Sequence, residues 1–212
     1  MSRPTHREIE IKLRVPDLAA LLRGLRRIGA ALKGRVFEQN MIYDTPDSAF
    51  RGTGRLLRLR LESPAPRIGA SRDLRLQRPR QRPRRALLTA KAPPYAGSPR
   101  SAAGRYKERL ERELVIREPA LWPRTLSALG LRPSFVYEKF RATFELPRLH
   151  LDLDETPVGT FLELEGSPRA IERAARGLGF SPRDYIRGTY WDVYAADCRR
   201  RGRPLKNMVF PS

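Results

Sequence analysis

The chain has 212 residues, of which 40% are hydrophobic and 31% charged, and its 43 Lys and Arg against 23 Asp and Glu give a formal net charge of +20. One sizeable core is therefore possible, whereas no apolar run approaches the roughly 20 residues that span a bilayer, and the single Cys198 excludes an internal disulfide. The charge indicates polyanionic partners, although an arginine excess is equally consistent with compositional drift on a solvated surface. The first residues lack the apolar run of a signal peptide, so we expect a cytoplasmic protein without membrane attachment.

The first predicted elements are a strand and a helix. Residues 7–15 alternate strictly between charged and apolar side chains, as in a strand with one polar face. Asp17 then provides an N-cap for a helix whose apolar stripe extends from Leu18 to Leu32. We expect this helix to end near residues 33–34, at a Lys-Gly pair.

The rest of the chain consists mainly of further predicted strands. Together with the helices they predict an α+β chain dominated by antiparallel sheet. The helices are expected at residues 119–129, 167–178 and 189–201. The strands are expected at residues 36–44, 55–61, 86–92, 105–117, 135–146, 149–155 and 159–166.

Two segments differ from these elements. Residues 62–86 are rich in Arg and Pro and nearly free of large apolar side chains, which predicts a flexible basic insert. The tail from about residue 202 is expected to be irregular. Because the chain is short for two cores, we expect a single domain over residues 1–212.

Charged residues recur in the predicted strands as i, i+2 pairs, which share one face of a strand. A solvated face with cross-strand ion pairs explains any one pair, but not a set in register on most strands. If the sheet closes into a barrel, these faces line one lumen, where buried charges need partners of opposite sign. The acidic pairs are Glu8/Glu10, Glu111/Glu113, Asp152/Asp154 and Glu163/Glu165, and the basic pairs are Arg58/Arg60, Lys107/Arg109 and Lys139/Arg141.

One class of ligand needs both kinds of charge. Carboxylate pairs offer hard oxygen ligands to Mg²⁺ or Mn²⁺, and Lys and Arg neutralise phosphate oxygens. A triphosphate with a bound divalent cation requires both at once. A basic clamp for polyphosphate or RNA has no need for paired carboxylates, which repel a polyanion when no metal is bound.

The two histidines of the chain, His6 and His150, are expected to be structural or exposed rather than catalytic.

The first strand also carries a family signature. Glu8-Ile9-Glu10-Ile11-Lys12 resembles the ExExK motif of the CYTH family, also called triphosphate tunnel metalloenzymes. The resemblance spans roughly residues 6–195, with further motifs in the family's order. These are Tyr43-Asp44-Thr45, Leu57-Arg58-Leu59-Arg60, Leu88-Thr89-Ala90-Lys91, Arg109-Leu110-Glu111-Arg112-Glu113, Lys139-Phe140-Arg141, Leu151-Asp152 and Phe161-Leu162-Glu163-Leu164-Glu165.

The resemblance implies an eight-stranded antiparallel β-barrel, the triphosphate tunnel, with a charged lumen and helices packed outside. A basic residue of the tail, Arg203 or Lys206, could also reach the substrate. The implied metal ligands are Glu8, Glu10, Asp152, Glu163 and Glu165, with Glu111 and Glu113 as further ligands or water holders. The implied triphosphate contacts are Lys12, Arg58, Arg60, Lys91, Arg109, Lys139 and Arg141, of which Lys12, Arg58, Arg60, Lys139 and Arg141 would stabilise charge on the reacting phosphate.

The family's activities leave three interpretations open. We expect a metal-dependent hydrolase of tripolyphosphate, thiamine triphosphate or a nucleoside triphosphate, as monomer or homodimer. Cyclisation of ATP is the second, although the cyclase subgroup carries His-Phe six residues before the first glutamate of ExExK, where this chain has Ser2-Arg3. The third is a non-catalytic module that binds polyphosphate or RNA. Binding of nucleic acid by the insert could coexist with catalysis but is not favoured.

Overall fold

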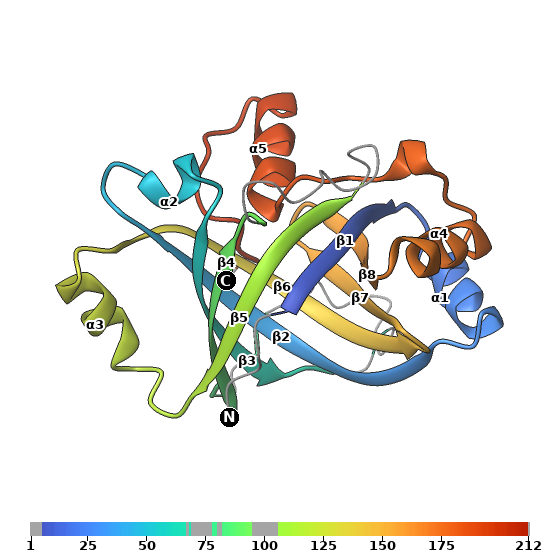
Figure 1. The fold of residues 1–212 in the computed structure, drawn as a ribbon, viewed down its shortest axis with the longest axis horizontal. Helices are drawn as coiled ribbons and strands as arrows, with labels where there is room; N and C mark the ends of the chain where they lie inside the picture. Colours follow the sequence, from blue (N-terminus) through green and yellow to red (C-terminus); the bar gives the residue numbers. More distant parts are fainter. Residues whose placement is uncertain (1–5, 67, 69–77, 80–81, 95–105, 212) are drawn as a thin grey trace.

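The computed structural model describes residues 6–66, 68, 78–79, 82–94 and 106–211. Eight antiparallel strands form a closed barrel in the order β1-β5-β4-β3-β2-β6-β7-β8, which confirms the predicted architecture (Figure 1). The strands are β1 (His6–Val15), β2 (Ala31–Asp44), β3 (Leu56–Pro64), β4 (Arg85–Ala92), β5 (Lys107–Ile116), β6 (Arg132–Leu146), β7 (Leu149–Thr156) and β8 (Gly159–Gly166).

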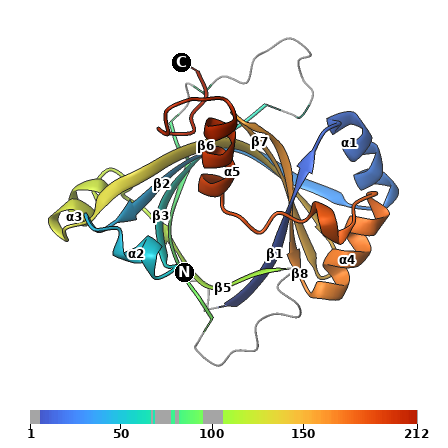
Figure 2. The same cartoon turned by 90° about the horizontal axis from the view of Figure 1, so that it is seen from above.

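The helices surround the barrel and leave its interior open. Helices α1 and α4 lie beside each other on one flank, α3 lies on the opposite flank, and α5 lies across one open end (Figure 2). Within the described residues, no helix is long and apolar enough to cross a membrane. The helical elements are α1 (Leu18–Arg27), α2 (Ala49–Gly52), α3 (Trp122–Ala128), α4 (Pro168–Gly177), the 3₁₀ turn η2 (Pro182–Asp184) and α5 (Tyr190–Arg200).

The main apolar core lies outside the barrel, between its wall and the pair α1–α4. Leu151 and Leu164 of β7 and β8 are fully buried there, against Leu25 of α1 and Ile171 of α4. Because side chains alternate along a strand, burying one face of these strands on the helices turns the other face into the lumen. The apolar alternation in the sequence therefore places the charged side chains inside.

Helix α1 is shorter than the helix expected to end near residues 33–34, so that expectation is wrong. Gly29 adopts φ 78°, and the N–H of Ala30 donates to the carbonyl of Leu25 at 2.9 Å. This C-terminal cap stops the helix. Leu32 consequently lies in β2, where it is 54% exposed, and not in a buried helical stripe.

The basic insert expected at residues 62–86 is shortened at both ends. Strand β3 continues to Pro64, and β4 begins at Arg85, which pairs with Glu62 of β3. Most of the remaining insert lies outside the described residues. One described insert side chain, Arg78, contacts the outer wall, with its Nε 2.8 Å from a carboxylate oxygen of Glu138.

The C-terminal tail pairs with β6 beside the part of that strand that β7 does not reach, although it lies outside helices and strands as expected. Met208 forms a parallel bridge with Tyr137, and the N–H of Phe210 donates to Glu138 at 3.1 Å. Glu138 is fully buried although it points out of the barrel. The tail therefore supplies partners that an outward-facing carboxylate would otherwise find in water.

Candidate active site

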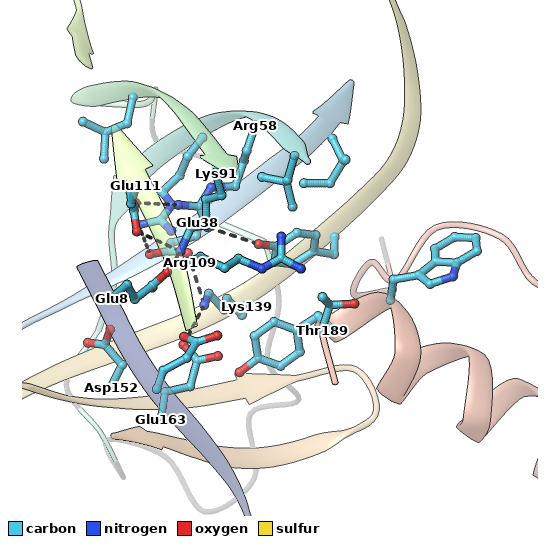
Figure 3. A pocket seen from close by; sticks show the side chains of 18 of the residues that line it. Glu8, Glu38, Arg58, Lys91, Arg109, Glu111, Lys139, Asp152, Glu163 and Thr189 are labelled. Carbon is cyan, nitrogen blue, oxygen red and sulfur yellow. Dashed lines mark hydrogen bonds and ion pairs between the residues drawn. The ribbon is translucent and has the colours of Figure 1, made fainter. Parts of the chain in front are cut away.

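A cavity of about 980 Å³ passes through the barrel and is walled by charged side chains from all eight strands (Figure 3). Apart from the two tail candidates, Arg203 and Lys206, every residue that the sequence predicted as a substrate or metal contact lines this cavity. They are Glu8, Glu10, Lys12, Arg58, Arg60, Lys91, Arg109, Glu111, Glu113, Lys139, Arg141, Asp152, Glu163 and Glu165. The structure thus brings the predicted set together, and the role of each residue remains a prediction.

Carboxylates gather on three neighbouring strands, β1, β8 and β7. Glu10 lies opposite Glu165 in the β1–β8 pair, and Asp152 lies opposite Glu163 in the β7–β8 pair. Like charges directly across a strand pair repel one another. The Nζ of Lys12, 2.5 Å from Glu163, offsets part of this repulsion.

Arg141 of β6 connects most of these acids. Its guanidinium lies 2.6 Å from Asp152 and 2.6 Å from Asp154, and it also contacts Glu163. Lys139, two residues earlier on the same strand face, lies 2.8 Å from Asp154. Lys139, Asp152 and Asp154 are buried. The side chains of Arg141 and Glu163 are 12% and 14% exposed, so these charges depend on one another more than on water.

A second group of ion pairs joins β1 to β4 and β5. The Nζ of Lys91 lies 2.7 Å from Glu8 and 2.8 Å from Glu111, and Lys107 contacts Glu10. Lys91, which was predicted to hold phosphate, and Lys107, which was not, therefore neutralise carboxylates predicted to hold metal or water. A bound ligand must exchange these pairs for its own charges.

The adjacent acids Glu8 and Glu10 differ in protonation. Burial raises the pKa of Glu8 to about 7, and the attraction of Lys91 only partly opposes that rise. Burial also disfavours the charged form of Glu10, but Lys107, with Lys12, outweighs it and lowers the pKa of Glu10 to about 2. The lysines therefore favour the ionised form of Glu10, whereas burial shifts the pKa of Glu8 toward neutrality.

Three polar or charged side chains that contact the lumen residues were absent from the predicted site. Glu38 of β2 is fully buried in the lumen, 3.1 Å from Arg60. Asp154, noted only as the neighbour of Asp152, is fully buried and accepts a 2.6 Å hydrogen bond from the phenol of Tyr190. Tyr190 comes from α5, which together with α2 adds helix residues to a cavity walled mainly by strands.

Replacing Glu38 by Gln is expected to flatten the loss of stability in acid. Burial opposes ionisation of Glu38, but Arg60, Lys139 and Arg141 lower its pKa below the ordinary 4.5. A depressed pKa contributes stability above about pH 4.5 that is lost as pH falls further. Urea unfolding between pH 7 and 3 should show a variant less stable at pH 7 and less acid-sensitive below 4.5; an unchanged slope would contradict this.

Two arginines of the lumen are weakly compensated. Arg58 of β3 reaches Glu111 only at 3.9 Å, and its buried Nε has no hydrogen-bond partner. Arg109 of β5 donates to the carbonyl of Gly54 at 3.2 Å and forms no ion pair with any described residue. A buried or half-buried guanidinium without a carboxylate favours an anionic ligand.

The donor set fits a divalent cation chemically. Carboxylate oxygens are the ligands that Mg²⁺ and Mn²⁺ prefer, and β1, β7 and β8 place them side by side. Among the described residues, no group of three or more Asp, Glu, His or Cys is already arranged around one metal position. Since Lys and Arg contact these acids, their displacement must accompany metal binding.

The remaining predicted positions lie at the edge of the site or outside it. His150 lines the cavity, is 42% exposed at its side chain and lies 3.2 Å from Asp152, whose hydrogen bond raises the histidine pKa. The side chain of His6 lies outside the described part of the chain. Arg203 and Lys206 are exposed and do not line the cavity, so the structure brings neither tail residue to the tunnel.

The fold and the site define a tunnel protein, and its family follows from the sequence. The model of the CYTH domain matches residues 6–190, so the chain belongs to the CYTH family. Among curated proteins, no sequence matches this chain.

Solved structures share the fold at low sequence identity. A candidate adenylate cyclase from Vibrio parahaemolyticus is 20% identical, with a TM-score of 0.65 over 91% of this chain and 99% of that one. A protein of Pyrococcus horikoshii is 21% identical, with a TM-score of 0.66 over 90% and 99%. A candidate adenylyl cyclase from Hippeastrum, described as having a dominant triphosphatase activity, is 19% identical, with a TM-score of 0.53 over 93% and 97%.

Proposed function

We propose that this protein is a divalent-metal-dependent triphosphate hydrolase that acts on an inorganic or organic triphosphate inside the barrel. The observation that carries the proposal is the charge asymmetry of the lumen. Glu163 and Glu165 lie on β8, whereas Arg58 and Arg60 lie on β3, four strands away in either direction round the barrel. A linear anion with a bound cation fits between two such walls.

The basic wall binds and orients the phosphates. Arg58 and Arg109, which lack close carboxylate partners, take the phosphate oxygens first, and Arg60 and Lys91 extend the contact along the lumen. Holding the triphosphate straight and offsetting its charge is most of phosphoryl-transfer catalysis. In hydrolysis, a water oxygen bonds to the terminal phosphorus while the anhydride bond to that phosphorus breaks.

The acidic wall holds the metal. Glu8, Glu10, Asp152, Glu163 and Glu165 are the proposed ligands, with Glu111 and Glu113 as further ligands or water holders. A divalent cation bound there would neutralise phosphate charge and lower the pKa of a bound water. Lys12 and Arg141, which contact these acids in the absence of ligand, would turn toward phosphate oxygens when the acids bind metal.

Adenylate cyclisation is the second candidate, because structural neighbours carry the name adenylate cyclase. The same tunnel would bind ATP, and the ribose 3′ oxygen would attack the α-phosphorus with release of pyrophosphate. Membership of the CYTH family supports both candidates. The triphosphatase activity described for the Hippeastrum protein supports hydrolysis as the first.

Product analysis separates the candidates. We would incubate the pure protein with Mg²⁺ or Mn²⁺ and, separately, tripolyphosphate, thiamine triphosphate and ATP, each with and without EDTA. Inorganic phosphate that disappears with EDTA is the expected result. Cyclic AMP and pyrophosphate from ATP would assign the cyclase, and metal-independent binding without turnover would assign the binding module instead.

A further inference from the structure

The two ends of the tunnel differ in side-chain chemistry. At the end formed by the start of β2 and the end of β6, the cavity is lined by residues such as Lys33, Val36 and Thr143, with no described Phe, Tyr or Trp. At the other end, α2 and α5 contribute Arg51 and Trp191 to the lining. Figure 2 shows α5 lying across this second end.

Trp191 is fixed at this end by two contacts. Its ring meets the ring of Phe135 nearly edge-on, with centroids 4.9 Å apart and an interplanar angle of 84°. The guanidinium carbon of Arg51 lies 4.3 Å from the Trp191 centroid. Phe135 stacks in turn on Tyr137 at 5.6 Å. A chain of planar groups therefore leads from the rim into the lumen.

The carboxylates at this end are engaged by the backbone. Asp44 accepts hydrogen bonds from the N–H groups of Phe50 at 2.9 Å and Arg51 at 3.1 Å, which holds α2 in place. Asp192 accepts from both the N–H and the hydroxyl of Thr189 at 2.7 Å. Arg51 is exposed and forms no ion pair with any described residue, so its guanidinium is available to a ligand.

We propose that this end binds the planar aromatic ring of an organic triphosphate, stacked against the Arg51–Trp191 pair. The inference rests on the proposed function and narrows its substrate class. We expect the protein to prefer triphosphates that carry a ring, such as a nucleoside triphosphate, to tripolyphosphate. Rings of this kind stack on guanidinium planes and on aromatic side chains with little regard to their polar edges. The phosphates would extend inward to Arg58 and Arg109, which lie on the same side of the cavity as Gly54 and α2.

The test compares substrates with and without a ring on three variants of the Arg51–Trp191 pair and one control variant. Arg51→Ala and Trp191→Ala are expected to raise KM for ATP or thiamine triphosphate about ten-fold and to leave KM for tripolyphosphate unchanged. Trp191→Phe should retain most of the affinity, since a ring remains. Arg124→Ala, at an exposed position of α3, is the matched control and should change neither substrate.

The outcomes separate this inference from the proposed function. Variants that affect tripolyphosphate and ATP equally, or a wild type that prefers tripolyphosphate, would overturn the inference and leave the hydrolase standing. If no triphosphate is hydrolysed, the proposed function fails. The inference is then tested by calorimetric measurement of ATP and tripolyphosphate binding instead of KM. Weaker binding of ATP alone to Arg51→Ala would then support the inference, and equal weakening of both ligands would reject it.

Discussion

Replacement of Glu10 by Gln is expected to lower metal-dependent kcat on the order of a hundredfold or more. Glu10 is buried in the lumen, opposite Glu165, and Lys107 and Lys12 lower its pKa to about 2, which favours its charged form at neutral pH. Gln has the same shape but removes the charge that a metal ligand needs. A divalent cation stabilises the charge of such transition states by several kcal/mol, so weaker metal binding should lower kcat strongly.

Two measurements make this prediction specific. Calorimetric titration of Mn²⁺ in the presence of a triphosphate should show weaker metal binding by Glu10→Gln, independently of turnover. Glu118→Gln removes one carboxylate at an exposed position that does not line the cavity and should match the parent in both assays. Full turnover and full Mn²⁺ binding in Glu10→Gln would remove Glu10 from the metal site.

Replacement of Arg141 by Met is expected to destabilise the barrel by about 3–5 kcal/mol. Arg141 contacts Asp152, Asp154 and Glu163, and its side chain is only 12% exposed. Met fills much of the volume but leaves the three acids without their shared partner. Breaking a buried ion pair from one side costs more than the pair contributes, because the remaining charge stays out of water.

Thermal and urea unfolding at pH 7 test this second prediction. The melting temperature should fall by roughly 6–20 °C, at 2–4 °C per kcal/mol for a chain of this size. Arg141→Lys, which keeps the charge but loses the bidentate contact, should lie between the parent and Arg141→Met. Arg124→Met is the control for loss of an arginine at an exposed site. If Arg141→Met is as stable as that control, the lumen acids do not depend on Arg141.

Strict alternation explains why most of the site was predictable. In β1 and β8 every second residue is apolar, so the faces of Glu8, Glu10, Glu163 and Glu165 follow from the sequence. Once strands pair in register, side chains that share a face also share the lumen. The architecture and the assembly of the predicted residues in one cavity therefore needed no information beyond the strand pattern and the family motif.

Glu38 could not be placed in the same way, because Glu38, Gln39 and Asn40 are three consecutive polar residues. Alternation gives no face in such a run. In the structure, Glu38 and Asn40 point into the lumen, while Gln39 donates to Glu138 on the outer face. The signal that could have identified Glu38 is its i, i+2 relation to Asn40, which is weaker than a pair of like charges.

Tyr190 was missed for a different reason. Helix position relative to a barrel depends on tertiary packing, and sequence periodicity describes only the face that a helix buries. The contact between Tyr190 and Asp154 joins residues 36 positions apart in the chain.

Helix α2 was missed because it has only four residues, too few to show helical periodicity in the sequence. It is held in place by the Asp44 carboxylate.

Closure of the barrel also constrains how the chain can fold. Strand β1 pairs with β5 on one side and with β8 on the other, and the contact between Lys12 and Glu163 spans 151 positions. Such distant pairing costs loop-closure entropy and slows folding. During synthesis, β1 leaves the ribosome with the row of N–H and C=O groups that faces β8 unpaired until β8 follows. For most of translation the first strand is therefore an open edge, able to pair with another chain, and the last strand both completes the tunnel and ends that exposure.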